Sequence, residues 1–410
     1  MAHNWTDKPL GDVITLQRGF DLPIQDRKTG NVPIVSSSGV TGTHSQIGVR
    51  APGVVTGRYG TIGQVFYIEK DFWPLNTTLY VKDFKGNDPR FISYLLQTID
   101  YLSCSDKSSV PGVNRNDLHQ IMVAVPEVSE QRMIAGVLKT LDAKIDLNRA
   151  MNETLEAMAR AIFKSWFVDF DPIRAKAAGR QPFGMDSATA ALFPQFLVGS
   201  EFGKIPAGWK VLKLSNLCST QYGYTTSAVE TSIGPKFLRV MDINKQNWID
   251  WSLVPHCSID DKSKDSYSLK VGDILVARMA DPGKSAIIDE DVDAVFASYL
   301  VRLKTNSLPE SYYIYGFLKS DQYAEYSEGV KSGSVQANMN ARVIVGATVV
   351  VPTMPLMEAY FRVALPLRQR IVLNVNESNT LANIRDALLP KLVSGEIRVK
   401  DAEKIVGGKV

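Results

Sequence analysis

One long stretch of this chain occurs twice, and the repeat limits the possible folds more than any other feature. Residues 127–167 align with residues 353–393 at a constant offset of 226 residues (353 minus 127), without an insertion or deletion. Asn148, for example, aligns with Asn374. A repeat of this length without gaps predicts that both copies form the same structural element.

The repeated stretch has the apolar spacing of a long helix. Its apolar residues recur at intervals of three and four, and the first copy contains one glycine, Gly136, and no proline. A continuous helix here would be on the order of 60 Å long and would need a partner along its length. We expect the second copy to be that partner in a coiled-coil-like spacer; two ordinary core helices of separate bundles are the alternative. Asn148 and Asn374 fall on the apolar stripe, where a polar residue can fix helix register. The side chains expected to pair the helices are Leu138, Leu141, Ile145, Asn148, Leu155, Ile162, Leu367, Ile371, Asn374, Leu381 and Leu388.

The rest of the chain also repeats, but more loosely. Trp209 corresponds to Trp5, and segments 211–214, 274–278, 299–301 and 349–352 correspond to 8–11, 54–58, 79–81 and 123–126. The offset changes along these segments, so the globular regions have changed length whereas the helices have not. We divide the chain into a first domain (1–125), a first long helix (126–168), a connector (169–206), a second domain (207–351), a second long helix (352–396) and a C-terminal tail (397–410).

Short apolar runs bounded by glycine and asparagine predict an α+β fold, with mixed strands and helices in each domain. In the first domain we expect strands at 32–35, 53–56, 63–68, 77–81 and 118–125, and a helix at 91–102. The connector is rich in proline and small residues. We expect its phenylalanines to pack on the rest of the protein: Phe183, Phe193, Phe196 and Phe202.

Composition gives few indications of a binding partner. The chain has 410 residues, 45% of them hydrophobic, and a formal net charge of +3. Any binding to DNA must therefore use locally arranged residues or rely on a partner protein for attraction to phosphate. Cys104, Cys218 and Cys257 are far apart, which is typical of reduced thiols in a cytoplasmic protein. The N-terminus lacks the apolar core of a signal peptide, and no window is apolar enough to span a membrane.

The sequence contains no recognisable catalytic motif. Gly283-Lys284-Ser285 matches the end of a Walker phosphate loop, but Arg278 stands where the first glycine is required. No His-Glu-x-x-His, no nuclease pattern of paired carboxylates with lysine, and no Asn-Pro-Pro-Tyr motif of amino-methyltransferases is present. The histidines also lack a Ser or Cys partner in a nucleophile motif: His3, His44, His119 and His256. We therefore expect no catalytic residue and no metal site.

Turns that carry hydrogen-bonding side chains remain as candidate binding residues. Arg, Ser, Thr, Asn and Gln contact base edges and phosphates, and glycine lets the main chain approach a DNA backbone. The same residues also occur in ordinary turns and surface ion pairs. The candidate DNA-binding residues are Arg18, Ser36, Ser37, Ser38, Arg58, Tyr59, Thr61, Asn76, Gln221, Tyr222, Tyr224, Thr225, Arg239, Asp242, Arg278 and Lys284.

Several longer motifs match one protein family. They are GRYGTIG at residues 57–63, WPLNT at 73–77, AIFKSWFVDFDP at 161–172, IPAGW at 205–209 and LLPKLVSGEI at 388–397. With them, the chain resembles the DNA-specificity subunits of type I restriction-modification systems over essentially its full length. One departure is that Leu356-Met357 replaces Glu130-Gln131 in the second helix copy. The start of the second long helix is therefore free to dock differently.

This resemblance implies two target-recognition domains, each reading one half of a split double-stranded DNA target, held apart by two long antiparallel helices. Two modification subunits, which carry S-adenosylmethionine and flip the target adenine, would bind around the helices and connector. Restriction subunits that use ATP and Mg would join that complex, while this chain would bind no cofactor and do no chemistry. Lengthening both helices by about one turn should then change only the gap between the half-sites.

Two alternatives to this interpretation remain. In the first, the chain is a tandem scaffold or ligand-binding protein whose two domains hold proteins or glycans, and its near-neutral charge favours this. In the second, it is a specificity subunit of a system that methylates DNA without cutting it, a difference that lies in the partner subunits.

Overall fold

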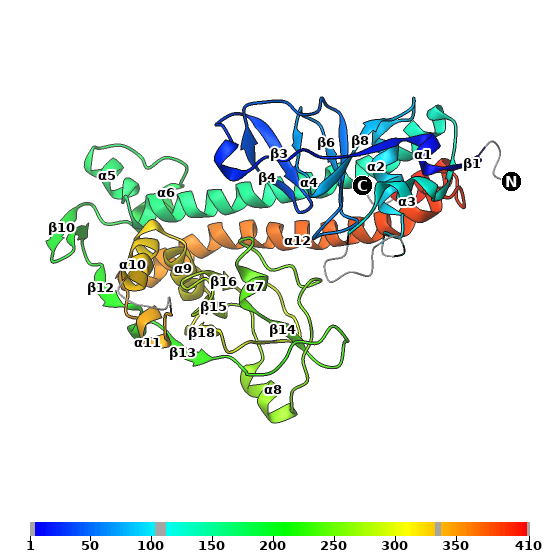
Figure 1. The fold of residues 1–410 in the computed structure, drawn as a ribbon. Helices are drawn as coiled ribbons and strands as arrows, with labels where there is room; N and C mark the ends of the chain where they lie inside the picture. The colour runs from blue at the N-terminus through cyan, green and yellow to red at the C-terminus, as the bar shows by residue number, and fades with distance from the viewer. Residues whose placement is uncertain (1–4, 102, 104–111, 333–337, 408–410) are drawn as a thin grey trace. The chain divides into compact units, whose positions relative to one another are not determined.

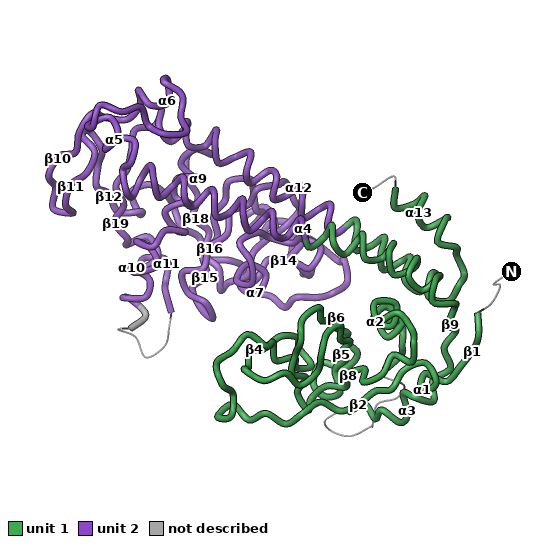
Figure 2. The backbone as a smooth tube through the Cα atoms, turned by 90° about the horizontal axis from the view of Figure 1, so that it is seen from above, with its two compact units in different colours: residues 1–146, 380–410 green, residues 147–379 purple. Residues whose placement is uncertain are grey.

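The computed structural model describes residues 5–101, 103, 112–332 and 338–407. They form two compact units: unit 1 comprises Met1–Asp146 and Thr380–Val410, and unit 2 comprises Leu147–Asn379 (Figure 2). Each unit contains one predicted globular domain and a part of each long helix. His3 and Cys104 lie outside the described residues, whereas Cys218 and Cys257 are free thiols.

The two repeated stretches form two helices of 40 residues each. Helix α4 spans Val128–Phe167 and α12 spans Met354–Val393, each within one residue of the repeated stretches 127–167 and 353–393, and α12 ends three residues before the expected limit of 396 (Figure 1). In unit 2, Phe163 of α4 packs on Tyr360 of α12, and Asn152 of α4 accepts a hydrogen bond from Asn374. Late residues of α4 therefore meet early residues of α12, so the helix segments of unit 2 run antiparallel.

The predicted pairing stripe is largely buried. Asn148 and Asn374 are each 1% exposed, and Nδ2 of Asn374 lies 2.8 Å from Oδ1 of Asn152, a residue that the sequence analysis did not single out. In unit 1, Leu138 and Leu141 of α4 share one core with Leu381 and Leu388 of α12. Four members of the stripe are only half-buried: Ile145, Leu155, Ile162 and Leu367.

The first domain is built on a four-stranded antiparallel sheet that α2 (Pro89–Gln97) covers. A second sheet includes a short parallel pair between β3 and β7, and the first and last strands of the domain, β1 and β9, pair with each other. The sheets have the orders β2(Thr15–Arg18)-β8(Thr78–Asp83)-β5(Gly53–Gly57)-β6(Val65–Ile68), β4(Gly39–His44)-β3(Val32–Ser36)-β7(Trp73–Pro74) and β1(Thr6–Pro9)-β9(Met122–Val125). Short helical segments complete the domain: α1(Leu10–Val13), η1(Ile24–Asp26) and α3(Arg115–Gln120).

The second domain repeats this topology. Its four-stranded sheet has the same order, its parallel pair joins β14 and β17, and its first and last strands again pair. The sheets are β13(Ser219–Tyr222)-β18(Leu300–Lys304)-β15(Ile274–Ala277)-β16(Ser285–Ile287), β14(Lys236–Leu238)-β17(Ala294–Phe296) and β12(Lys210–Lys213)-β19(Thr348–Val351). Its helical segments are η2(Leu214–Asn216), α7(Val240–Ile243), α8(Asp261–Tyr267), α9(Leu308–Leu318), α10(Asp321–Ser332) and α11(Ala341–Ile344).

The strand register corrects two of the predicted correspondences. The N–H of Leu10 donates to Ile121 and that of Leu214 donates to Ala347, so segment 8–11 matches 212–215 rather than 211–214. Val55 pairs with Tyr80 and Leu275 pairs with Arg302, so segment 79–81 matches 301–303 rather than 299–301. A few apolar residues do not fix the register of a strand when the loops before it have changed length.

Three predicted elements of unit 1 also differ from the structure. The last strand, expected at 118–125, is shorter because Asn114 caps α3 by accepting the N–H of Asn116, and β9 begins only at Met122. The helix expected at 91–102 is α2, which Asp88 caps and which ends at Gln97. The C-terminal tail contains α13 (Val399–Gly407), which buries one apolar face in the core of unit 1.

The two long helices start differently, as the departure at Leu356-Met357 allowed. In α4, the buried side chain of Gln131 accepts the N–H of Asp88 and donates to Asn87. In α12, Leu356 and Met357 are buried in an apolar cluster instead. Hydrogen bonds therefore dock one helix start and apolar contacts dock the other.

The connector packs on unit 2 through one of its four predicted phenylalanines. Phe193 is buried, and its ring centroid lies 5.3 Å from that of Trp166 in α4. Phe183, Phe196 and Phe202 are exposed, so the prediction was wrong for them. The connector forms α5(Asp171–Ala177), α6(Ser187–Ala191) and the hairpin β10(Leu197–Ser200)-β11(Gly203–Pro206).

Ion pairs and hydrogen bonds of charged residues join each domain to its long helices. In unit 2, Arg368 of α12 bonds to Glu156 of α4 and to Asp289 of the second domain, and all three side chains are at most 6% exposed. In unit 1, Asp142 of α4 accepts hydrogen bonds from Arg385 of α12 and from Tyr94 of α2. The unit 2 contact fixes the domain on its helix segments because buried charges need matched partners, whereas the Arg385–Asp142 pair of unit 1 is only half-buried.

We expect the stability of unit 2 to depend on pH through Lys319. Lys319 donates to Ser285 O at 2.6 Å, and burial lowers the pKa of its ammonium to about 7. An unfolded lysine has a pKa of about 10.4, so the unfolded chain binds an extra proton between these values. Relative to Lys319→Met, we expect the wild type to gain about 1 kcal/mol of unfolding free energy per pH unit between pH 7.5 and 9.5.

Urea unfolding of both proteins at three pH values in this range measures that gain. Lys262→Met is the matched control, because Lys262 is an exposed lysine of the same unit. Parallel pH profiles for wild type and Lys319→Met would contradict the prediction.

No helix among the described residues is both long and apolar enough to cross a membrane.

Candidate nucleic-acid interface

Four predicted turns of the first domain come together beside the sheet. The N–H of Asn76 donates to Phe20 O, and the N–H of Arg58 donates to Thr77 O. Ser37 lies against Gly57 and Gly60. The turns around residues 18–20, 36–38, 58–61 and 76–77 therefore form one surface, which we call turn cluster 1.

A carboxylate that the sequence analysis missed occupies part of turn cluster 1. Asp21 accepts a hydrogen bond from the Asn76 amide and forms a 3.4 Å ion pair with Arg18. Arg18 and Asp21 are both largely exposed, so this pairing is weak and open to competition by a ligand. Nothing in the sequence distinguishes Asp21 from other turn residues.

The serine turn is held by its own hydroxyl groups. Ser36 Oγ lies 2.9 Å from Ser38 Oγ and donates to Gly39 O at 3.2 Å. Ser36 and Ser37 are half-buried, whereas Ser38 and Thr61 are exposed. Of the hydroxyl candidates in turn cluster 1, Ser38 and Thr61 are thus the most accessible.

The second domain contains an equivalent surface, turn cluster 2. A Cβ atom at Gly19 would lie 2.2 Å from Leu75 O, and one at Gly223 would lie 2.2 Å from Ala297 O. Both positions therefore need glycine, and Arg18-Gly19-Phe20 corresponds to Tyr222-Gly223-Tyr224. Turn cluster 2 contains, or is bordered by, five of the predicted residues: Tyr222, Tyr224, Thr225, Arg278 and Lys284.

Arg278 and Tyr222 form the centre of turn cluster 2. The Arg278 guanidinium lies 5.0 Å from the centroid of the Tyr222 ring, and the Tyr222 hydroxyl accepts the N–H of Ala341. Tyr224 packs on Tyr267 at 5.3 Å, and Thr225 is exposed. Lys284 follows Gly283 in the turn between β15 and β16, so this Gly-Lys-Ser sequence begins a strand rather than the helix of a phosphate loop.

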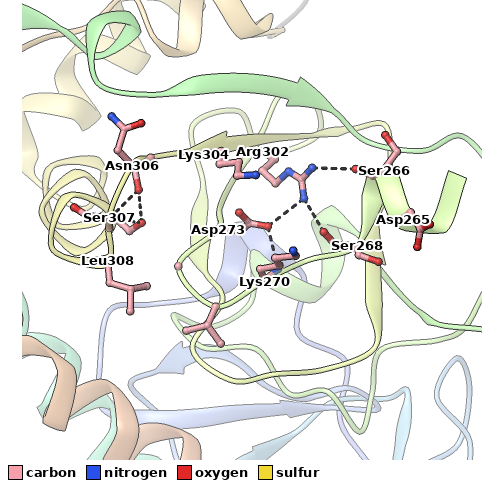
Figure 3. A pocket seen from close by; sticks show the side chains of 14 residues that line it. Asp265, Ser266, Ser268, Lys270, Asp273, Arg302, Lys304, Asn306, Ser307 and Leu308 are labelled. Carbon is pink, nitrogen blue, oxygen red and sulfur yellow. Dashed lines mark hydrogen bonds and ion pairs between the residues drawn. The ribbon is translucent and has the colours of Figure 1, made fainter. Parts of the chain in front are cut away.

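Both polar atoms of the Gln221 side chain form hydrogen bonds within the second domain. Its amide oxygen accepts a hydrogen bond from Arg302, and its amide nitrogen donates to Ser266 O. Arg302 also bonds to Asp273, Ser266 and Ser268 at the wall of a cavity of about 430 Å³ (Figure 3). Arg302 was not among the predicted residues, although a charged residue between Val301 and Leu303 in an apolar strand is a signal for a buried ion pair.

Arg239 and Asp242 also bond to each other. The Arg239 guanidinium donates to both carboxylate oxygens of Asp242, each at 3.0 Å, and these bonds raise the pKa of Arg239. Asp242 also accepts the N–H of Arg239 at the start of α7. The structure thus gives this pair a helix-capping role and does not bring it into contact with Arg278.

The described residues contain no group of three His, Cys, Asp or Glu side chains arranged to hold a metal ion.

Comparisons with known proteins relate this chain to one group of restriction-enzyme subunits. A family model described as the type I restriction modification DNA specificity domain matches residues 2–157. The MjaIX specificity subunit of a type I restriction enzyme from Methanocaldococcus jannaschii is 27% identical over 323 residues, which cover 76% of this chain and 69% of that protein. The HindI specificity subunit from Haemophilus influenzae is 24% identical over 391 residues, covering 82% and 84%.

A solved structure has the same fold. The crystal structure of the type I restriction-modification S subunit from M. genitalium aligns with a TM-score of 0.55 at 14% identity, covering 95% of this chain and 96% of that chain. The first 157 residues thus match the type I restriction modification DNA specificity domain, and most of the chain is similar to specificity subunits of type I restriction enzymes.

Proposed function

We propose that this chain reads a bipartite double-stranded DNA target, with turn cluster 1 contacting one half-site and turn cluster 2 the other. The observation that carries the proposal is the repeat of one domain topology. In each cluster a glycine, Gly19 or Gly223, lies close to a main-chain carbonyl oxygen, and an arginine occupies a similar place. Two modest readers on one chain bind cooperatively because the second contact becomes intramolecular.

We further propose that the chain does no chemistry itself. Two modification subunits would bring S-adenosylmethionine and the methyl-transfer site, and restriction subunits would bring ATP and Mg. The repeat supports two modification subunits, because each unit offers an equivalent pair of helix segments and one domain. The small net charge of +3 fits a shared interface, in which partners supply part of the attraction to phosphate.

Mapping methylated bases in a host that co-expresses this chain with its modification subunit tests the proposal. We expect methylation at a split motif of two short sequences around a fixed gap. Replacing residues 1–125 by those of another family member should change one half of the motif completely and leave the other half and the gap unchanged, because each domain carries its own turn cluster.

The same experiment separates this proposal from the scaffold alternative. A stable complex that methylates a continuous motif, or a swap that alters both halves, would contradict the assignment of one domain to each half-site. Failure to form any complex with the modification subunit would favour a scaffold that holds proteins or glycans.

A further inference from the structure

Arg58 and Arg278 occupy the same place in the two domains. The N–H of Arg58 donates to Thr77 O, and its carbonyl accepts the N–H of Val113. The N–H of Arg278 donates to Tyr299 O, and its carbonyl accepts the N–H of Met339. Main-chain bonds on both sides fix each Cα atom, so each side chain leaves the domain from an equivalent, rigid point.

These two arginines differ from the other candidate arginines in their partners. Among the described residues, Arg18 pairs with Asp21 and Arg239 with Asp242, but neither Arg58 nor Arg278 has a carboxylate partner. A tyrosine ring lies beneath each guanidinium instead, at 4.5 Å for Arg58 and 5.0 Å for Arg278. A stacked guanidinium keeps its charge and its N–H donors available for an anion.

The tyrosines come from different parts of the two domains. Tyr59 is the next residue after Arg58, whereas Tyr222 belongs to β13 and lies far from Arg278 in the sequence. Two tyrosines from different parts of the sequence, Tyr59 and Tyr222, thus lie beneath a guanidinium at the equivalent position of each domain. The position of the arginine, rather than the surrounding sequence, is therefore what the two clusters have in common.

Because both domains place an arginine at the same point, this arginine is suited to bind a part of the DNA that both half-sites share. Base edges differ between DNA sequences, whereas the phosphate backbone is the same in every sequence. We propose that Arg58 and Arg278 each bind a backbone phosphate and set the position of their domain on the duplex, leaving base discrimination to the variable side chains of the same cluster. This inference rests on the proposed DNA-reading function.

Salt-dependent DNA binding tests the inference. The complete complex with modification subunits is titrated with its mapped duplex, and with duplexes altered in one half-site, at several salt concentrations. Arg58→Ala and Arg278→Ala should each lower the slope of log Kd against log salt by about 0.9, the value for one phosphate contact. Each should weaken binding to all duplexes by the same factor, roughly tenfold or more, and leave the methylated motif unchanged.

Two further variants separate a phosphate contact from a structural role. Arg58→Lys keeps the charge, so it should keep most of the salt slope. Arg90→Ala is the matched control, because Arg90 also stacks on a tyrosine, Tyr67 at 3.8 Å, but is neutralised by Glu69 at 2.5 Å. Its salt slope should equal that of the wild type.

The outcomes are distinct. If Arg58→Ala relaxes the base preference in one half-site only, that arginine reads bases and the inference is wrong. An unchanged slope and affinity would also overturn it. Failure of the proposed function would appear differently, as a wild-type complex that neither binds nor methylates DNA.

Discussion

Replacing Arg368 by alanine should destabilise unit 2 by about 3–5 kcal/mol, the usual cost of breaking a buried ion pair. Arg368 is the cation between two carboxylates, Glu156 and Asp289, and all three side chains are at most 6% exposed. Without it, both carboxyl groups would stay buried without a countercharge, and burial by itself raises the pKa of Asp289. Hydrogen exchange of the full chain measures the effect, because exchange should accelerate in residues 147–379 but not in unit 1.

Arg370→Ala is the matched control for this prediction. Arg370 lies two residues further along α12 and is exposed, so its loss should change stability by at most about 0.5 kcal/mol. Replacing Arg368, Glu156 and Asp289 together by apolar residues should recover much of the lost stability, since no charge is then left unpaired. Equal exchange rates in Arg368→Ala and the wild type would show that the cluster does not hold unit 2 together.

Inserting seven residues into both long helices should lengthen the gap between the half-sites by up to about three base pairs. Seven helical residues add roughly 10 Å, and DNA rises about 3.4 Å per base pair. A heptad is preferable to a single turn, because it keeps the apolar stripe within about 20° of its original direction. The insertions belong at residues 146 and 379, where both helices pass from one unit to the other.

Methylation mapping gives the result directly, since the two half-site sequences should be unchanged while the gap grows. An insertion into α4 alone is the control. With seven residues added to one helix only, the segments of α4 on either side of residue 146 cannot both keep their register with an unaltered α12 and continue as one helix, so the gap should not grow in that variant. An unchanged gap in the doubly lengthened chain would rule out the helices as the spacer.

The long helices could be predicted from the sequence because their signal is local and repeated. Asn148 and Asn374 stand out in an apolar stripe, and both are buried. The partners of Arg302 and Asp21 could not be found in this way, because Asp273 and Asn76 are distant in the chain and only the folded sheet brings them together. Strand register was missed for a related reason: loops of unequal length hide which residue of β18 corresponds to Leu79.

The candidate site was only partly predictable. Residue type alone placed Arg58 and Arg239 in one class, yet the structure pairs Arg239 with Asp242 and leaves Arg58 without a carboxylate among the described residues. The clustering of the turns depends on long-range main-chain bonds, such as that from Asn76 to Phe20. Periodicity and composition carry no information on such contacts.

Unit 1 is built from both ends of the chain, and this has a consequence for its folding during synthesis. Its core includes Leu138 and Leu141, which are made early, and Leu381, Leu388 and Ala402, which are made late. At about 5–20 residues per second, the ribosome needs roughly 10–50 s to make the residues of unit 2 that lie between them. The domain that is synthesised first is therefore one whose core can close only after the C-terminal residues are made, and until then Leu381 and Leu388 cannot cover the apolar surface around Leu138 and Leu141.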